Sequence, residues 1–262
     1  MRASWCGAGG ERIVVVMDTT TSTVFIPGAT SGIGLALAQR LQAAGSTVVI
    51  GGRRRSLLDT LAAEHGFDTV AIDVSDPASI RVAAAEVLDR HPALDGLVTM
   101  SGIMRNEDLR DPGHIDDAVA TVETNLLGTI RLIDAFLPQL LSRPTSTLVT
   151  VTSGLGYVPL TATPTYSATK AAVHSYTQAL RQQLVGSSVQ VLELAPPAVR
   201  TDLMGGADFG GMPLDAFADE VMDLLRSGAA PEVLVEDVLP LRWAERDGTH
   251  QQILEAMAGR GH

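Results

Sequence analysis

The stretch Thr23-Val-Phe-Ile-Pro-Gly28-Ala-Thr-Ser-Gly32-Ile-Gly34-Leu-Ala-Leu-Ala-Gln-Arg-Leu41 decides the fold of this chain. A short β-branched and aromatic run leads into three glycines, and apolar residues then recur at helical spacing up to Gly45, a plausible C-cap. The pattern predicts a strand, a glycine-rich turn and a helix. Such glycines let backbone come close to a pyrophosphate, and a helix start offers free N–H groups to an anion. The spacing Gly-x-x-x-Gly-x-Gly is not the usual dinucleotide fingerprint, so a tight turn without a ligand is the alternative.

The same alternation of strand and helix patterns continues along the chain. The predicted strands cover 23–27, 46–51, 68–72, 94–100, 146–152, 189–194 and 232–236. The predicted helices cover 32–44, 54–65, 77–91, 114–141, 165–185 and 215–226. Strands that alternate with helices imply right-handed crossovers. The sequence therefore predicts an α/β fold: a single doubly wound parallel sheet of about seven strands, with helices on both faces.

Composition narrows the possible partners. The chain has 262 residues, of which 45% are apolar, a net charge of −11 and a pI near 4.9. The acidic balance argues against a nucleic acid or an anionic membrane as partner, and no apolar run is long enough for a transmembrane helix. Cys6 is the only cysteine, which excludes an intrachain disulfide and fits a cytoplasmic location. The six histidines show no metal-site spacing, so we expect no metal.

Residues 1–22 precede the first predicted strand and stand apart from the domain expected over 23–262. They mix small residues with Ile13-Val-Val-Val16 and lack the long apolar segment of a secretory signal. We predict an N-terminal arm that is disordered or weakly packed. Met17 would give a normally short lead into the first strand, so the stretch before it can also reflect a misassigned start.

Tyr166 and Lys170 form the strongest chemical pattern. They lie four residues apart in a predicted helix, which places the phenol and the ammonium on one face. A nearby ammonium favours the phenolate, so we expect the tyrosine pKa to fall and the residue to transfer a proton. Ser153 adds a hydroxyl that could hold a substrate oxygen. The pair alone could also occur by chance on an exposed helix.

Taken in order, the three glycines, Asn125, Ser153, Tyr166 and Lys170 resemble the classical short-chain dehydrogenase/reductase family. The resemblance runs from about Thr23 to the end of the chain. It implies a Rossmann domain and transfer of a hydride between a nicotinamide cofactor and a carbonyl or alcohol. It further implies that Ser153 polarises the carbonyl, Tyr166 passes the proton, and Lys170 holds the nicotinamide ribose. Asn125 would interrupt its helix and support a water relay.

The resemblance also implies the cofactor site. Its expected members are Gly28, Thr30, Ser31, Gly32, Ile33, Gly34, Asp73, Val74, Ser101, Gly102, Pro196, Val199 and Thr201, together with Tyr166 and Lys170. Cofactor choice depends on Gly51-Gly52-Arg53-Arg54-Arg55, which ends the second predicted strand. Users of NAD tend to carry an acidic residue here, whereas a guanidinium suits the 2′-phosphate of NADP. We therefore favour NADP(H) over NAD(H), bound by Arg53 and Arg54. The alternative is a basic start to a surface helix.

The chain departs from the family pattern in three places. Pro27 stands where threonine is usual, and Thr99-Met-Ser-Gly102 replaces Asn-Asn-Ala-Gly. In the family, the threonine and an asparagine of these two segments make polar contacts with each other. Losing both partners of such a contact can be nearly neutral for stability, so we expect an apolar Pro27–Met100 neighbourhood. Pro197 replaces a common glycine and stiffens the loop. The segment Pro196-Pro-Ala-Val-Arg-Thr-Asp-Leu203 resembles a subgroup named for D-alanine esterification of teichoic acid, a name that does not identify a substrate.

The expected substrate contacts are Met104, Leu155, Tyr157 and Met204, and residues 202–217 are expected to form a lid. They favour a small, largely apolar carbonyl or secondary alcohol. A homodimer or homotetramer is expected by family analogy. Two alternatives stay open: an epimerase or dehydratase of the same fold, and a non-catalytic protein that senses NAD(P) or binds a partner.

Overall fold

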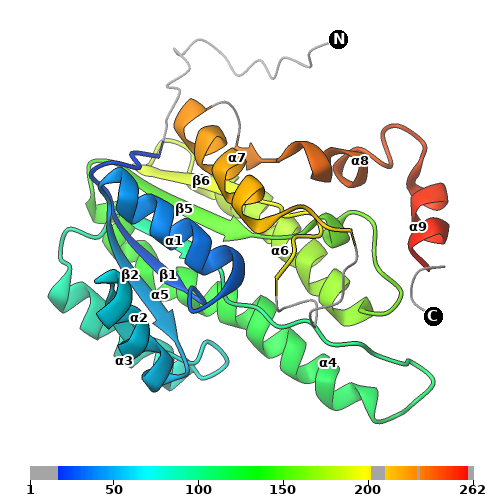
Figure 1. The fold of residues 1–262 in the computed structure, drawn as a ribbon, viewed down its shortest axis with the longest axis horizontal. Helices are drawn as coiled ribbons and strands as arrows, with labels where there is room; N and C mark the ends of the chain where they lie inside the picture. Colours follow the sequence, from blue (N-terminus) through cyan, green and yellow to red (C-terminus); the bar gives the residue numbers. More distant parts are fainter. Residues whose placement is uncertain (1–16, 202–209, 229–230, 259–262) are drawn as a thin grey trace.

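The computed structural model describes residues 17–201, 210–228 and 231–258. Seven parallel strands form one sheet in the order β3-β2-β1-β4-β5-β6-β7, with helices on both faces (Figure 1). The predicted fold is therefore confirmed.

The strands are β1 (Thr23–Pro27), β2 (Thr47–Gly52), β3 (Asp68–Ala71), β4 (Gly96–Thr99), β5 (Ser146–Val151), β6 (Val189–Leu194) and β7 (Glu232–Val233). The helices are α1 (Gly32–Ala44), α2 (Arg55–His65), α3 (Pro77–Arg90), α4 (His114–Val122), α5 (Gly128–Ser142), α6 (Pro164–Gln183), α7 (Leu214–Ser227), α8 (Leu239–Arg242) and α9 (His250–Ala258). Shorter turns of helix are η1 (Glu123–Leu127), η2 (Gly154–Gly156) and η4 (Glu236–Val238). The helices α8 and α9 lie beyond the last predicted element.

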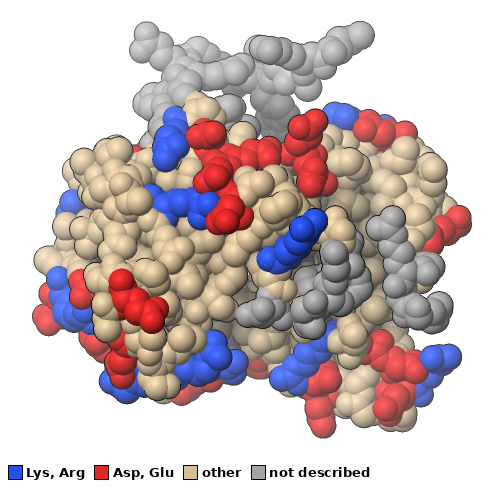
Figure 2. All heavy atoms as spheres, viewed as in Figure 1, with Lys and Arg blue, Asp and Glu red and all other residues tan. Residues whose placement is uncertain are grey.

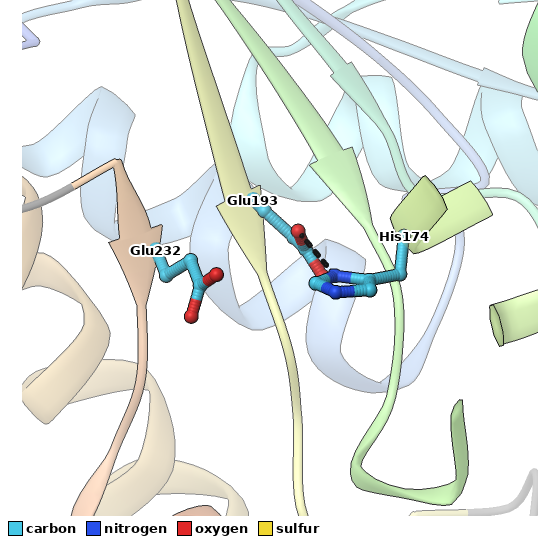
Figure 3. Close-up of side chains that lie close together, drawn as sticks. All are labelled: His174, Glu193 and Glu232. Atoms are coloured by element: carbon cyan, nitrogen blue, oxygen red, sulfur yellow. Dashed lines mark hydrogen bonds and ion pairs between the residues drawn. The ribbon is translucent and has the colours of Figure 1, made fainter. Parts of the chain in front are cut away.

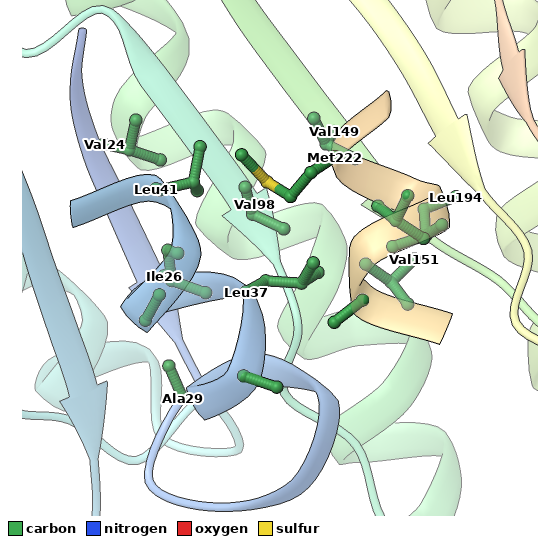
Figure 4. Packing of buried hydrophobic residues seen from close by; sticks show 14 of the residues in the cluster. Val24, Ile26, Ala29, Leu37, Leu41, Val98, Val149, Val151, Leu194 and Met222 are labelled. Carbon is green, nitrogen blue, oxygen red and sulfur yellow. The ribbon is translucent and has the colours of Figure 1, made fainter. Parts of the chain in front are cut away.

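The apolar core follows the alternation of side chains along β1. Val24 belongs to the cluster between the sheet and α1 and α7, whereas Phe25 belongs to the cluster against α3 and α5. Phe25 meets Phe136 of α5 with ring centroids 5.1 Å apart. Leu37 of α1 and Met222 of α7 converge on the other face (Figure 4). A strand buried on both faces explains why β1 reads as a continuous apolar run.

The long helix predicted over 114–141 is divided near its middle. A π-helical segment, η1, separates α4 from α5 and contains Asn125. Such a segment adds one residue to a turn and is frequent at functional sites. The interruption expected at Asn125 is therefore confirmed.

The charged surface is mixed in sign. Acidic and basic side chains are interspersed on the face in Figure 2. Arg40 of α1 bridges to Asp219 and Asp215 of α7 at 2.7 and 3.1 Å, but the acidic partners are exposed, so these ion pairs stabilise little. In the described ranges, no helix combines the length and the apolar character needed to cross a membrane.

Residues 17–22 are packed, although the sequence predicted an arm that is disordered or weakly packed up to residue 22. Met17 is 2% exposed and belongs to the core cluster under α1. The Thr19 carbonyl accepts a hydrogen bond from Ser46 Oγ at 2.8 Å, and the Ser22 carbonyl accepts one from the Thr47 N–H at 2.9 Å. The segment thus closes over the turn between α1 and β2. The rest of the predicted arm, residues 1–16, lies outside the described residues.

Gly45 ends α1 as predicted, in the left-handed region with φ +116°, and its N–H bonds to the Gln42 carbonyl at 3.0 Å. A Cβ at this position would lie 2.6 Å from the Thr20 carbonyl oxygen. Gly66 ends α2 with φ +71°, but a Cβ there would meet nothing within 4 Å. Alanine substitution would therefore cause backbone strain at both glycines but a steric clash only at Gly45.

We predict that Gly45→Ala destabilises the protein more than Gly66→Ala. The left-handed conformation should cost about 1–2 kcal/mol in either variant. Forcing Thr20 aside should add about 1–3 kcal/mol for Gly45→Ala alone. Urea unfolding measures both free energies of unfolding. Equal losses would mean that residues 17–22 do not pack on this turn in solution.

Candidate active site

Four predicted catalytic residues come from three neighbouring parts of the fold. Ser153 follows the end of β5, Tyr166 and Lys170 lie on α6, and Asn125 lies in η1. All four are buried, with 1–7% of each residue exposed. The structure brings them together at the carboxyl edge of the sheet, where ligands of open α/β folds bind.

The Ser153 hydroxyl lies close enough to the Tyr166 phenol to favour its ionised form. Ser153 Oγ also accepts a bond from the Leu155 N–H at 3.1 Å, which fixes the hydroxyl at the start of η2. Burial raises the pKa of Tyr166, and the nearby Ser153 hydroxyl opposes that rise. The sequence predicted a fall caused by Lys170. In the structure desolvation is the larger effect, because the phenol is enclosed by protein.

Lys170 is the only lysine among the 19 lysine and arginine residues of the chain. Its ammonium donates to the Val151 carbonyl at 2.8 Å and lies 5.6 Å from the centroid of the Tyr166 ring. Burial disfavours the charged form and lowers the pKa of Lys170 to about 8. The site therefore contains an ammonium that loses its proton far more easily than an exposed lysine does.

Asn125 connects the site to the loop after β4. Its Oδ1 accepts from the Ile103 N–H at 2.8 Å, and its Nδ2 donates to the Ile103 carbonyl at 2.9 Å and to Thr169 Oγ1 at 3.3 Å. A Cβ on Gly102 would lie 3.4 Å from Asn125 Oδ1 and 3.9 Å from Lys170 Nζ. The amide, the ammonium and the Gly102 backbone thus enclose one small space.

The glycine-rich turn is in close contact with the residues that follow β4. A Cβ on Gly28, whose φ is +91°, would lie 2.6 Å from the Cα of Ser101. A Cβ on Gly34 would lie 2.8 Å from the Gly28 carbonyl oxygen and from Met100 Cγ. Ser31 caps α1 with extended backbone and makes no side-chain cap bond. Ile33, partly buried, packs on the core cluster under α1. The turn is therefore a tight cradle at a helix start, which suits a pyrophosphate.

Pro27 ends the pairing of β1 with β4. The ladder between these strands stops at Phe25↔Leu97, because the next bond would require an N–H at Pro27. The Val98 carbonyl accepts instead from the Met100 N–H at 2.9 Å. The Met100 side chain packs on the apolar cluster under α1, which fits the expected apolar neighbourhood. Direct contact between Pro27 and Met100 stays a prediction.

The end of β2 leaves no room for an acidic side chain. A Cβ on Gly52 would lie 2.5 Å from Thr30 Cγ2, and one on Gly51 would lie 2.9 Å from Ile72 Cγ2. Arg53 and Arg54 follow immediately and are exposed, and Arg54 caps α2.

Asp73 ends the neighbouring strand region beside this surface. Burial opposes its ionisation, but hydrogen bonds from Ser75 and the charge of Arg53 hold the pKa of Asp73 below its usual value. Val74 is buried in the cluster against α3. The Val74 carbonyl oxygen would lie 2.8 Å from a Cβ on Gly128, the first residue of α5. The structure therefore places Asp73 near Arg53 and directs Val74 into the core.

The loop after β6 returns to the glycine-rich turn. A Cβ on Gly32 would lie 3.4 Å from Thr201 Cγ2. The Pro196 carbonyl accepts from the Gly154 N–H at 2.9 Å, and Val199 forms a bridge with Met212. These contacts bring both ends of the predicted cofactor site together.

The lid predicted over residues 202–217 does not extend into α7. Residues 214–217 form the first turn of α7, and Phe217 is fully buried in the core, so it is not a lid residue. Residues 202–209, including Met204, lie outside the described residues. Met104 and Leu155 are both partly buried; Met104 follows Ile103, which is bonded to Asn125, and Leu155 lies two residues after Ser153. Tyr157 differs from expectation, because its hydroxyl donates inward to Glu193 at 3.0 Å.

Glu193, which is fully buried, belongs to a group of side chains that the sequence analysis missed. His174 of α6, Glu193 of β6 and Glu232 of β7 place potential ligand atoms within 4.8 Å of one another (Figure 3). They are far apart in sequence, so no local spacing connects them. The available signal was a charged residue inside the otherwise apolar run Val191-Leu-Glu-Leu-Ala195.

Comparisons with known proteins agree with this geometry. The sequence model described as short chain dehydrogenase matches residues 22–208. The uncharacterized oxidoreductase DltE of Bacillus subtilis (strain 168) is 34% identical over 251 residues, which cover 92% of this chain and 98% of that protein. This relative confirms the predicted subgroup resemblance.

Two solved structures extend the comparison. A short-chain dehydrogenase from Streptomyces avermitilis matches with a TM-score of 0.78 at 26% identity, over 90% of this chain and 96% of that chain. The closed form of a serine dehydrogenase complexed with NADP+ matches with a TM-score of 0.71 at 25% identity, over 77% of this chain and 88% of that chain. Together with the convergence of Ser153, Tyr166 and Lys170, these matches establish that the chain belongs to the short-chain dehydrogenase/reductase family.

Proposed function

We propose that this oxidoreductase uses NADP(H) to interconvert a carbonyl and a secondary alcohol on a small, largely apolar substrate. The observation that carries the proposal is the buried convergence of the Ser153 hydroxyl, the Tyr166 phenol and the Lys170 ammonium. These groups can hold a substrate oxygen and exchange a proton with it. They leave the hydride to be supplied by a cofactor.

The residues present fit a dinucleotide. Gly28 and Gly34 approach neighbouring backbone so closely that no side chain fits, and they lead directly into the start of α1. The N–H groups of that first turn would face a pyrophosphate. Thr201, beside Gly32, would close the crevice from the loop after β6.

The preference for NADP(H) is supported by the end of β2. Users of NAD bind the ribose 2′-hydroxyl through a carboxylate. An acidic residue in place of Gly51 would displace Ile72, and one in place of Gly52 would displace Thr30. Arg53 and Arg54 offer guanidinium groups to a 2′-phosphate. The similar serine dehydrogenase is described in complex with NADP+.

The bound nicotinamide would supply or accept the hydride. Ser153 would donate to the substrate oxygen and hold it beside the Tyr166 hydroxyl, which would deliver or take the proton. Lys170, positioned by the Val151 carbonyl, would face the ribose, and its charge would favour the phenolate. Asn125 would keep the Ile103 loop in place at the far side of Lys170.

The expected homodimer or homotetramer and the cytoplasmic location stay predictions. Exposed apolar side chains on α4 support the first of these, since Ile115 and Val119 are 56% and 55% exposed.

Tyr166→Phe should abolish most turnover while leaving the fold and NADPH binding intact, because it removes only the hydroxyl. General acid–base catalysis contributes about 10²–10⁴-fold, so kcat should fall by at least that order. NADPH oxidation with a panel of carbonyl compounds measures it. Tyr176→Phe on the same helix is the control and should keep full activity. Near-normal turnover by Tyr166→Phe would reject the proton-transfer assignment. Tight NADPH binding without any turnover by the wild type would favour a non-catalytic protein.

Arg53→Ala should weaken binding of NADPH much more than binding of NADH, since only NADPH carries the 2′-phosphate. A charge-assisted hydrogen bond is worth about 1.5–3 kcal/mol, or roughly 10- to 150-fold in Kd. Arg55→Ala, at the first position of α2, is the matched control. Titration of cofactor fluorescence gives both Kd values, and equal weakening would remove Arg53 from the site.

The side chain of Lys170 should titrate near pH 8 in the folded protein, well below the ordinary value for lysine, because burial penalises its charged form. Because Lys170 is the only lysine, protein labelled with ¹³C-lysine should give a single Cε resonance to follow against pH. In urea the same resonance should titrate near the ordinary lysine pKa. A folded-state midpoint at the ordinary value would mean that the ammonium is solvated in solution.

A further inference from the structure

Glu193 is a carboxylate in the interior of the fold. It lies on β6, and none of its surface is exposed. Its Oε1 accepts three side-chain hydrogen bonds: from Thr152 Oγ1 at 2.8 Å, from the Tyr157 hydroxyl at 3.0 Å and from His174 Nδ1 at 2.8 Å. His174 Nδ1 also lies 2.9 Å from Oε2. A buried charge persists only when it is compensated in this way.

Each donor belongs to a segment that carries a catalytic group. Thr152 directly precedes Ser153, and Tyr157 ends the short helical turn that follows it. His174 lies on α6 four residues after Lys170, so the two side chains occupy one face of the helix. Glu193 therefore connects the segment around Ser153 with the helix α6 that carries Tyr166 and Lys170.

These contacts form a closed ring. Lys170 donates to the Val151 carbonyl, and Val151 is joined by a peptide bond to Thr152. Thr152 donates to Glu193, which binds His174, and His174 returns along α6 to Lys170. If the carboxylate is lost, both the strand end and the helix turn that hold Lys170 lose their common partner.

The group fits an anchor better than a metal site. Glu232 is already bound to the Arg242 guanidinium through both oxygens, at 2.8 and 2.9 Å. Arg242 also stacks on the Tyr157 ring at 5.0 Å, so a guanidinium already supplies the positive charge beside Glu232. The donors to Glu193 are side chains of the same chain.

We propose that Glu193 is a positioning residue, whose carboxylate fixes the Ser153 turn against the face of α6 that presents Tyr166 and Lys170. The role for catalysis rests on the function proposed above. Misplacement of catalytic groups by about 1 Å can reduce a rate about 10²-fold, so an anchor beneath the site controls kcat without touching substrate.

The test compares Glu193→Ala with Glu193→Gln in the full-length protein. The amide keeps an oxygen that can replace Oε1, so Glu193→Gln should restore activity to within about tenfold of wild type, whereas Glu193→Ala should lower kcat about 10²-fold. Binding of NADPH should weaken less than kcat falls in Glu193→Ala, because Glu193 lies strands away from the glycine-rich turn and reaches the cofactor site only through Lys170. Tyr157→Phe removes one donor and should give a smaller loss; it serves if Glu193→Ala does not fold.

Asp95→Ala is the matched control. Asp95 precedes β4 at the opposite edge of the sheet, and its carboxylate accepts from the Thr23 N–H at 2.8 Å. The Asp95→Ala variant should have a lower melting temperature but an unchanged kcat at temperatures where the protein is folded. An equal kcat loss in Asp95→Ala and Glu193→Ala would overturn the proposal, because the effect would then be one of general stability.

The single lysine resonance gives a readout that needs no substrate. The Cε signal of Lys170 and its titration midpoint should move in Glu193→Ala, return toward the wild-type values in Glu193→Gln, and stay unchanged in Asp95→Ala. An unchanged signal in Glu193→Ala would reject the anchoring role. If the signal moves but the wild type turns over no carbonyl or alcohol, the anchor stands and the proposed function fails.

Discussion

The close approach of the glycine-rich turn to the carboxyl ends of β1 and β4 is the constraint on which the site depends. Gly28 lies against Ser101, and Gly34 lies against Met100, with no space for a Cβ at either glycine. This packing is possible because the strand order of the sheet reverses between the neighbouring strands β1 and β4: β2 and β3 lie on one side, and β5, β6 and β7 lie on the other. It sets the start of α1 beside the loop that carries Gly102, and so beside Asn125 and Lys170.

Pro27 shows how a departure from a family pattern can be absorbed. Without an N–H at this position, β1 and β4 separate one step early, and the Val98 carbonyl finds its partner in Met100. A buried acceptor that keeps a hydrogen bond costs little. The polar residues of the family pattern are thus replaced by a local turn and by apolar packing of Met100.

Burial determines the direction of both pKa shifts in the active site. It lowers the pKa of Lys170 to about 8 and raises the pKa of Tyr166, so both groups are biased toward their neutral forms. Keeping such groups inside the protein requires fixed partners, since an unpaired buried polar group is strongly destabilising. The Val151 carbonyl provides one for Lys170, Ser153 lies near the Tyr166 phenol, and Glu193 holds Thr152 between Val151 and Ser153.

The sequence by itself determined the order of strands and helices, the glycine-rich turn, and the pairing of Tyr166 with Lys170, because each depends on spacing within a few residues. It also located Asn125 and Ser153, through their order in the family pattern. Only the tertiary structure decided that Met17 packs in the core, that Thr30 excludes a side chain at Gly52, and that Glu193 meets His174. It likewise reversed the expected direction of the Tyr166 pKa shift. These features arise from contacts between distant segments and from desolvation, and neither leaves a periodic pattern in the chain.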